Sequence, residues 1–211
     1  RHRSLVKTGI TPDVITLIGI VMSGVAAVTI GAGYLRVGFL FLLLTAIPDA
    51  LDGAVARAAG TGSKRGAYFD SVSDRLTDGM LFGGVAWYLA STEPGRIMML
   101  PVAIMGLAMF ISYQRAKAES LGWDAKGGIM ERAERIVVLA FALLFPELLI
   151  ATLWVMLVLT AITAVQRFVK VWKQATAEHD RPAPARRARR RPRTRTSVEP
   201  LWRQRMRERR E

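Results

Sequence analysis

Four aspartates stand out in this chain because they lie at regular spacing within apolar sequence. Asp49 and Asp52 are three residues apart, and Asp70 and Asp74 are four apart, so each pair lies on one face of a helix. A short turn between the two helices would bring the pairs together. An unpaired carboxylate inside a bilayer costs about 2.5 to 3.5 kcal/mol, and repulsion between like charges adds to this cost. The spacing therefore predicts a cation site in a membrane protein.

Only oxygen ligands are available near these aspartates. The chain has no cysteine, and its two histidines, His2 and His179, lie outside the apolar segments. All-carboxylate sites suit Mg²⁺ or Mn²⁺, which are often shared with substrate phosphates. Gly53 leaves room for a ligand beside the backbone, and Arg57 can bind a phosphate through two hydrogen bonds. Two divalent ions among four aspartates can neutralise a pyrophosphate and stabilise charge on a leaving phosphate.

The elements that must position these residues are long and apolar. The chain has 211 residues, 51% of them hydrophobic, and a mean hydropathy of +0.25. All but the fifth of its apolar stretches approach or reach the length of about 20 residues that crosses hydrocarbon. Pro146 and Glu147 predict a tight turn before the last one. The pattern predicts an all-α integral membrane protein with six transmembrane helices, within 14–33, 37–59, 67–90, 97–118, 134–147 and 149–172.

The positive charge is concentrated at the C-terminal end. The formal net charge is +13, and residues 181–211 hold 13 Arg and 3 Glu, which gives +10. This segment is interrupted by prolines and has too little apolar content to fold alone. We predict a six-helix membrane domain over 1–175 and an Arg/Pro-rich disordered tail over 176–211. Such a tail favours anionic headgroups, at about 1 kcal/mol per basic residue near the surface, and not nucleic acid.

The loops predict the orientation. Basic residues gather on one side, and the other side carries little charge, so the basic side is expected to be cytoplasmic. Both termini and the aspartates are then cytoplasmic, in a multi-pass protein of the plasma membrane. The basic side carries the tail and Arg57, Lys64, Arg65, Arg115, Lys117, Lys126, Arg132 and Arg135.

The spacing D-x2-D-G-x2-A-R-x8-G-x3-D-x3-D, from Asp49 to Asp74, resembles the signature of the CDP-alcohol phosphotransferases. The resemblance covers about residues 8–172. It implies a six-helix membrane enzyme, usually a homodimer, which displaces CMP from a CDP-linked lipid with an alcohol hydroxyl. It also implies two Mg²⁺ ions, or Mn²⁺, bound by Asp49, Asp52, Asp70 and Asp74, with Asp74 acting as the catalytic base. The residues that it places against CDP-diacylglycerol are Asp13, Val14, Ile15, Thr16, Gly53, Arg57 and Ser63.

Segments 112–119, 127–135 and 165–167 resemble the branch of this family whose acceptor is inositol phosphate. The product would be phosphatidylinositol phosphate, released with CMP. In that branch three basic residues hold the acceptor phosphate, and they correspond to Arg115, Arg135 and Arg167. The branch usually has Lys where Arg115 stands, Arg where Lys117 stands and Pro where Ala133 stands. The exchange at Arg115 keeps the charge and alters the geometry of the donors.

Three alternatives stay open at this point. Glycerol 3-phosphate could be the acceptor instead, which would give phosphatidylglycerophosphate. The three arginines could be ordinary flanking charge on the cytoplasmic side. A divalent-cation transporter would also place carboxylates in a membrane, although its ligands are expected near the midplane in repeated halves. Here they cluster in the first half of the chain beside Arg57, which a cation path does not need.

Some remaining polar and small residues have structural interpretations. Asp78 extends the stripe of Asp70 and Asp74 by four residues and is expected to make a polar contact between helices. Glu131 and Glu134 are expected to orient nearby arginines. Gly79 and Gly83 form a small-xxx-small pair, which favours packing within the helix bundle over a dimer contact.

Overall fold

The computed structural model describes residues 12–45 and 64–179, with the backbone alone for 12–15. Every regular element in this part of the chain is a helix, so the predicted all-helical class is confirmed there. A second compact unit, Ala177–Glu211, contributes only its first residues to the described part. The elements are α1 (Pro12–Gly31), a helical segment Leu35–Thr45, α3 (Lys64–Thr92), α4 (Met99–Ser120), α5 (Arg132–Leu144), the short 3₁₀ helix η2 (Pro146–Leu148) and α6 (Leu149–His179).

The helix ends follow from local sequence. Gly33 adopts φ +91° just after α1, a conformation that glycine takes without the penalty of a side chain. Pro94 and Gly95 separate α3 from α4, and Gly95 also has a positive φ of 76°. Pro146 ends α5 because proline restricts the residue before it to extended backbone, and Phe145 has ψ 79°. The tight turn predicted at this position is confirmed.

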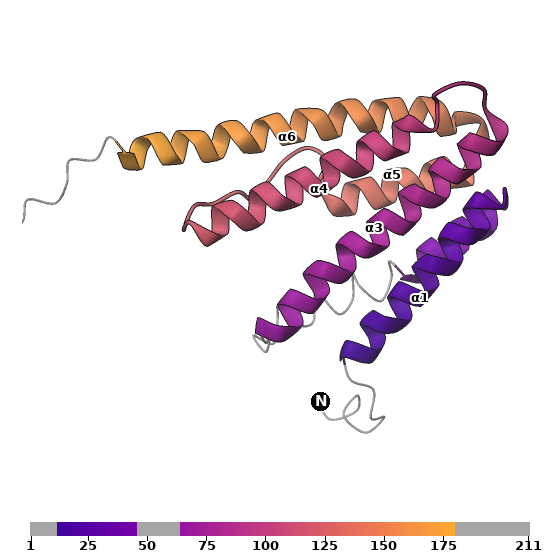
Figure 1. Ribbon diagram of the computed structural model, residues 1–211, viewed down its shortest axis with the longest axis horizontal. Coiled ribbons are helices and arrows are strands. Elements are labelled where there is room, and N and C mark those ends of the chain that lie inside the picture. Colours follow the sequence, from indigo (N-terminus) through magenta and orange to yellow (C-terminus); the bar gives the residue numbers. More distant parts are fainter. Residues whose placement is uncertain (1–11, 46–63, 180–211) are drawn as a thin grey trace, which may run out of the picture. The chain divides into compact units, whose positions relative to one another are not determined.

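Helices α1 and α3 lie side by side (Figure 1). Their contact buries Ala26 and Ile30 of α1 and Phe82 and Val85 of α3 in one hydrophobic core. The backbones approach closely at Gly84, where a Cβ atom would lie 2.5 Å from the carbonyl oxygen of Ala27. Glycine at this position therefore sets the distance between the two helices.

The small-residue pair of α3 has two different environments. A Cβ atom on Gly79 would be 3.9 Å from the sulfur of Met105 on α4, whereas one on Gly83 would meet no described atom within 4 Å. The predicted packing within the bundle thus applies to Gly79. It does not apply to Gly83, because the glycine that packs against a neighbouring helix is the next residue, Gly84.

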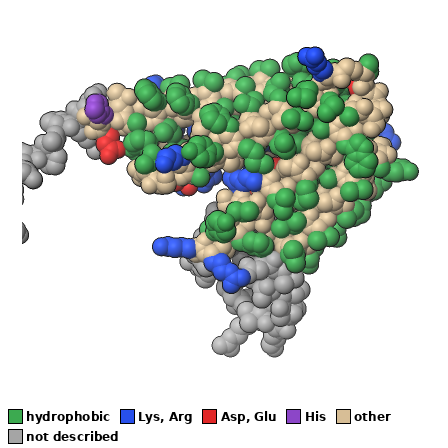
Figure 2. All heavy atoms as spheres, viewed as in Figure 1, with side chains coloured by type: hydrophobic (Ala, Val, Ile, Leu, Met, Phe, Trp, Pro, Cys, Tyr) green, Lys and Arg blue, Asp and Glu red, His purple; other side chains and the backbone are tan. Residues whose placement is uncertain are grey.

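Two helical segments, Met99–Ser120 and Pro146–His179, are long and apolar enough to cross a membrane by length and composition. The shorter helices Thr16–Gly31 and Leu35–Thr45 are also apolar. Hydrophobic side chains cover much of the face of the helices seen in Figure 2. On α6 the exposed apolar residues include Trp154, Val155, Val158, Ile162, Val165, Phe168, Val169 and Trp172.

Candidate active site

The described structure contains part of the predicted site. Asp49, Asp52, Gly53, Arg57 and Ser63 lie outside the described residues. The segment 13–16 forms the first turn of α1, since this helix begins at Pro12. The described site is therefore built from α3, from the three predicted acceptor arginines and from the loop between α4 and α5.

Asp70 and Asp74 lie one helical turn apart on α3, as their spacing predicted. Asp70 is exposed, and the side chain of Asp74 keeps 20% of its surface accessible. Within the described residues no group of three or more potential metal ligands comes together, and this part of the chain holds only two of the four predicted aspartates. Two carboxylates on one helix face offer the hard oxygen atoms that Mg²⁺ and Mn²⁺ prefer.

The carboxylate of Asp74 contacts cations on both sides. Arg132 Nη1 lies 2.9 Å from Asp74 Oδ1, and Arg75 Nη1 lies 3.5 Å from Oδ2. Arg75 also donates to the carbonyl oxygen of Ser71 on its own helix, at 2.7 Å. Asp74 is thus bound to the start of α5 by Arg132 and flanked by Arg75 from α3 itself.

Asp78 joins two arginines of α5. Its Oδ1 accepts from Arg132 Nε at 3.2 Å, and its Oδ2 lies 3.4 Å from Arg135 Nη2. The side chains of Asp78 and Arg135 are 7% and 3% exposed, so each neutralises a charge that would otherwise be buried alone. The predicted role of Asp78 as a polar contact between helices is confirmed.

Arg167 connects α6 to α4 and to the loop before α5. Its Nη1 donates to the carbonyl oxygen of Ile111 at 3.2 Å, and its Nη2 lies 2.9 Å from Glu131 Oε1. In the opposite direction, Gln114 of α4 donates through Nε2 to the carbonyl oxygen of Ala164 at 3.4 Å. The predicted orienting role of Glu131 is confirmed for Arg167.

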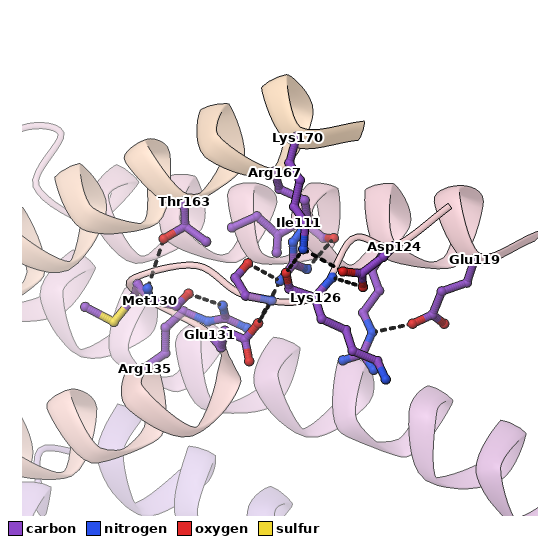
Figure 3. A network of polar contacts seen from close by, with 12 residues as sticks. Ile111, Glu119, Asp124, Lys126, Met130, Glu131, Arg135, Thr163, Arg167 and Lys170 are labelled. Atoms are coloured by element: carbon purple, nitrogen blue, oxygen red, sulfur yellow. Dashed lines mark hydrogen bonds and ion pairs between the residues drawn. The ribbon is translucent and has the colours of Figure 1, made fainter. Parts of the chain in front are cut away.

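The loop 121–131 is bound along α6 by polar contacts (Figure 3). Lys170 Nζ lies 2.7 Å from Asp124 Oδ2 and donates to the carbonyl oxygen of Lys126 at 2.7 Å. The backbone N–H of Met130 donates to Thr163 Oγ1 at 2.9 Å. The hydrogen bond from Lys170 holds the pKa of Asp124 below its usual value. These contacts give the loop a defined position on α6.

Two of the three predicted acceptor arginines meet at this loop. Arg135 donates to the carbonyl oxygen of Met130 at 3.1 Å, and Arg167 donates to that of Gly127 at 3.2 Å. Each of these two arginines also has a buried Nε with no hydrogen-bond partner among the described residues. Arg115 is more exposed, at 44%, and pairs with Glu119 at 2.9 Å. The structure therefore brings Arg135 and Arg167 to one loop and leaves Arg115 in a local pair on α4.

Sequence reasoning missed the role of Arg132. Besides Asp74 and Asp78, its guanidinium donates to Thr77 Oγ1 at 3.1 Å. Arg132 was visible in the sequence only as one of many basic residues on one side. Its spacing of three from Arg135, opposite the stripe of acidic residues on α3, is the one signal that could have identified it.

Comparison with known proteins identifies the family. Residues 9–166 match the CDP-alcohol phosphatidyltransferase family. The chain is 37% identical over 180 residues to phosphatidylinositol phosphate synthase of Mycobacterium marinum, which covers 81% of this chain and 77% of that protein. Over 189 residues it is 33% identical to the protein of the same name from Corynebacterium glutamicum, with 86% of each chain covered.

Solved structures give the same result. The fold matches phosphatidylinositol phosphate synthase of Mycobacterium tuberculosis with CDP-DAG bound, with a TM-score of 0.74 and 33% identity over 81% of this chain and 90% of that chain. The same enzyme in complex with manganese and citrate matches with a TM-score of 0.73 and 34% identity, over 81% of this chain and 86% of that chain. With a family match over most of its length and relatives above 30% identity, this chain belongs to the CDP-alcohol phosphatidyltransferase family.

Proposed function

We propose that this chain transfers the phosphatidyl group of CDP-diacylglycerol to the hydroxyl of inositol phosphate, giving phosphatidylinositol phosphate and CMP. The observation that carries this proposal is the identity of 37% to a phosphatidylinositol phosphate synthase, over 81% of the chain. The buried Arg135 and Arg167 add physical support, since a phosphorylated acceptor needs cations near the hydroxyl that reacts. A cation transporter does not account for the family membership.

The reacting groups are assigned from the aspartate motif and from the accessibility of its last aspartate on α3. Asp49, Asp52, Asp70 and Asp74 would hold two divalent ions, Mg²⁺ with Mn²⁺ as a substitute. Bound metal would neutralise the pyrophosphate and stabilise charge on the departing CMP. We assign removal of the proton of the acceptor hydroxyl to Asp74, the last aspartate of the motif, and its side chain remains 20% accessible to that hydroxyl. Manganese in a similar enzyme is compatible with this ligand set.

The substrates are assigned to two sets of residues. We assign CDP-diacylglycerol to Asp13, Val14, Ile15, Thr16, Gly53, Arg57 and Ser63. The phosphate of the acceptor is assigned to Arg115, Arg135 and Arg167. An unpaired buried donor costs about 1 to 3 kcal/mol, and the Nε atoms of Arg135 and Arg167 are two such donors within the described residues. A bound phosphate that reaches them would remove this cost.

We further infer that the enzyme is a multi-pass homodimer of the plasma membrane. Six spans with cytoplasmic termini are supported by the two helices that are long and apolar enough to cross a membrane, by the other apolar stretches of the sequence, and by the basic loops and tail. In this orientation the active site faces the cytoplasm, where a water-soluble phosphorylated acceptor is available. The membrane domain then comprises 1–175, and 176–211 forms its cytoplasmic tail.

The proposal is tested by CMP release from CDP-diacylglycerol and Mg²⁺ by the purified protein, with one acceptor at a time. The acceptors are inositol phosphate, glycerol 3-phosphate and free myo-inositol. Inositol phosphate should give the highest rate. Free myo-inositol should be poor because it leaves the arginines without a phosphate. The Asp74→Asn variant, purified in the same way, is the negative control, because any CMP release that remains in it measures contaminating activity.

Each outcome has a distinct meaning. A faster rate with glycerol 3-phosphate than with inositol phosphate at equal concentration would overturn the inositol assignment and leave phosphatidyl transfer in place. No CMP release with any of the acceptors would overturn the proposed activity. Chelation of the divalent metal should stop the reaction, and a rate unaffected by chelation would contradict the two-metal assignment.

A further inference from the structure

Arg132 uses all three nitrogen atoms of its guanidinium on one face of α3. Nη1 lies 2.9 Å from Asp74 Oδ1, Nε lies 3.2 Å from Asp78 Oδ1, and Nη2 lies 3.1 Å from Thr77 Oγ1. The three partners lie within four residues of one another, so one rigid planar group spans a full helical turn. A flexible ammonium group could not make this set of contacts.

This set of contacts links two functional groups that come from different helices. Arg132 contacts Asp74, the proposed base, and Asp78. Asp78 in turn contacts Arg135, the proposed ligand of the acceptor phosphate. Arg135 and Asp78 are almost completely buried, so this end of the network has little freedom to move. The Asp74 carboxylate is therefore held at a defined place relative to Arg135.

We propose that Arg132 is a positioning residue that orients the Asp74 carboxylate relative to the bound acceptor. The inference rests on the proposed function, in which Asp74 accepts the proton of the acceptor hydroxyl. Proton transfer needs the base within hydrogen-bond reach of that hydroxyl. A displacement of about 1 Å can lower the rate by about a hundredfold. Arg132 itself touches neither substrate and acts through Asp74.

Arg75 provides a matched control. It also places a cation beside Asp74, at 3.5 Å, but its other contact is the carbonyl oxygen of Ser71 on the same helix. The exposures of Arg75 and Arg132 are similar, at 33% and 31%. Replacing either arginine removes one positive charge near Asp74, and only the replacement of Arg132 removes the ion pair that connects Asp74 to α5.

The experiment compares Arg132→Gln, Arg132→Lys and Arg75→Gln with the wild type in CMP release, with kcat and both KM values measured. We expect Arg132→Gln to lower kcat by about ten- to a hundredfold, with the KM for CDP-diacylglycerol within about threefold of wild type. Arg132→Lys should stay low because one ammonium group cannot contact all three partners. Arg75→Gln should keep most of its kcat. Binding of CDP-diacylglycerol and thermal unfolding verify that each variant is folded.

Equal losses in Arg132→Gln and Arg75→Gln would overturn the inference, because charge alone would then explain both. A return to wild-type kcat in Arg132→Lys would overturn it for the same reason. If Arg132→Gln does not fold, the test rests on Arg132→Lys: a low kcat supports the inference, and a wild-type kcat overturns it. A wild type that releases no CMP would refute the proposed function and with it this inference, whereas an active wild type with unaffected Arg132 variants would refute the inference alone.

Discussion

Asp74 differs from Asp70 in its surroundings, although both belong to the same motif. Asp70 is exposed, whereas Asp74 has an arginine on each of its two oxygens. An isosteric change at Asp74 therefore separates binding from chemistry. We expect Asp74→Asn to bind CDP-diacylglycerol and to lose about 10² to 10⁴ in turnover, because an amide cannot accept the proton. Turnover near that of wild type in the purified variant would remove Asp74 from this role.

The arginines assigned to the acceptor differ in burial, which allows a second prediction. Arg167→Gln should raise the KM for inositol phosphate by about tenfold or more, since a charge-assisted contact contributes about 1.5 to 3 kcal/mol. The KM for CDP-diacylglycerol should change much less. Arg115→Gln should have a smaller effect, because Arg115 is 44% exposed and already pairs with Glu119. Equal effects on both substrates would mean that Arg167 supports the fold instead.

Among these residues, motif positions were predictable and cross-helix partners were not. The alignment of Asp70 with Asp74 on α3 follows from a spacing of four. The contact of Arg132 with Asp78 joins residues 54 positions apart, and a single sequence does not show which residues so far apart in the chain lie close in space. The charge of Arg132 did not distinguish it from the other basic residues on the predicted cytoplasmic side, because arginines are common on that side of any membrane protein.

The contact between α1 and α3 depends on one glycine. Gly84→Ala would place a Cβ atom 2.5 Å from the carbonyl oxygen of Ala27, whose backbone cannot move away as a side chain could. Overpacking of this kind costs about 1 to 3 kcal/mol, so we expect a lower midpoint of thermal unfolding in detergent. Gly83→Ala is the control, since its Cβ would meet no described atom within 4 Å. Equal midpoints for the two variants would contradict the close approach.

The helices themselves were largely predictable from hydropathy. The stretch predicted over 97–118 corresponds to α4 at Met99–Ser120, and 134–147 corresponds to α5 at Arg132–Leu144. The predicted stretch over 149–172 is shorter than α6, which continues to His179. The apolar stretch ends before Lys173, whereas the helix continues, and its polar extension binds the loop: the backbone N–H of Asp124 donates to Gln174 Oε1 at 2.9 Å. The prediction that Gly83 packs within the bundle was wrong, because residue spacing alone does not show which side of a helix faces a neighbour.

The whole chain combines an apolar helical part with a strongly basic C-terminal segment. Removal of residues 181–211 should leave specific activity within a few-fold, because the family match ends at residue 166. The same truncation removes a net charge of +10 and should weaken attraction to anionic headgroups, at about 1 kcal/mol per basic residue near the surface. Activity assays and flotation with vesicles of anionic lipid measure the two effects. A folded truncation without activity would show that the segment belongs to the site.

The ion pair of Arg167 and Glu131 also constrains the order in which this protein could lose, during evolution, the charged site that we propose for its acceptor. The Arg167 side chain is 4% exposed and that of Glu131 is 39% exposed. Loss of Arg167 first leaves a carboxylate that water can reach. Loss of Glu131 first leaves a buried cation without its counter-ion, at a cost of about 1 to 3 kcal/mol.

A lineage that moves toward an uncharged acceptor should therefore replace the arginine before the glutamate. Expression and thermal stability of Arg167→Met, Glu131→Gln and the double variant test this order. We expect Glu131→Gln to be the least stable of the three and the double variant to recover. If Arg167→Met were the least stable, the path would run in the opposite direction. Because Arg167 is more buried than Glu131, substitution of the arginine is expected to precede substitution of the glutamate.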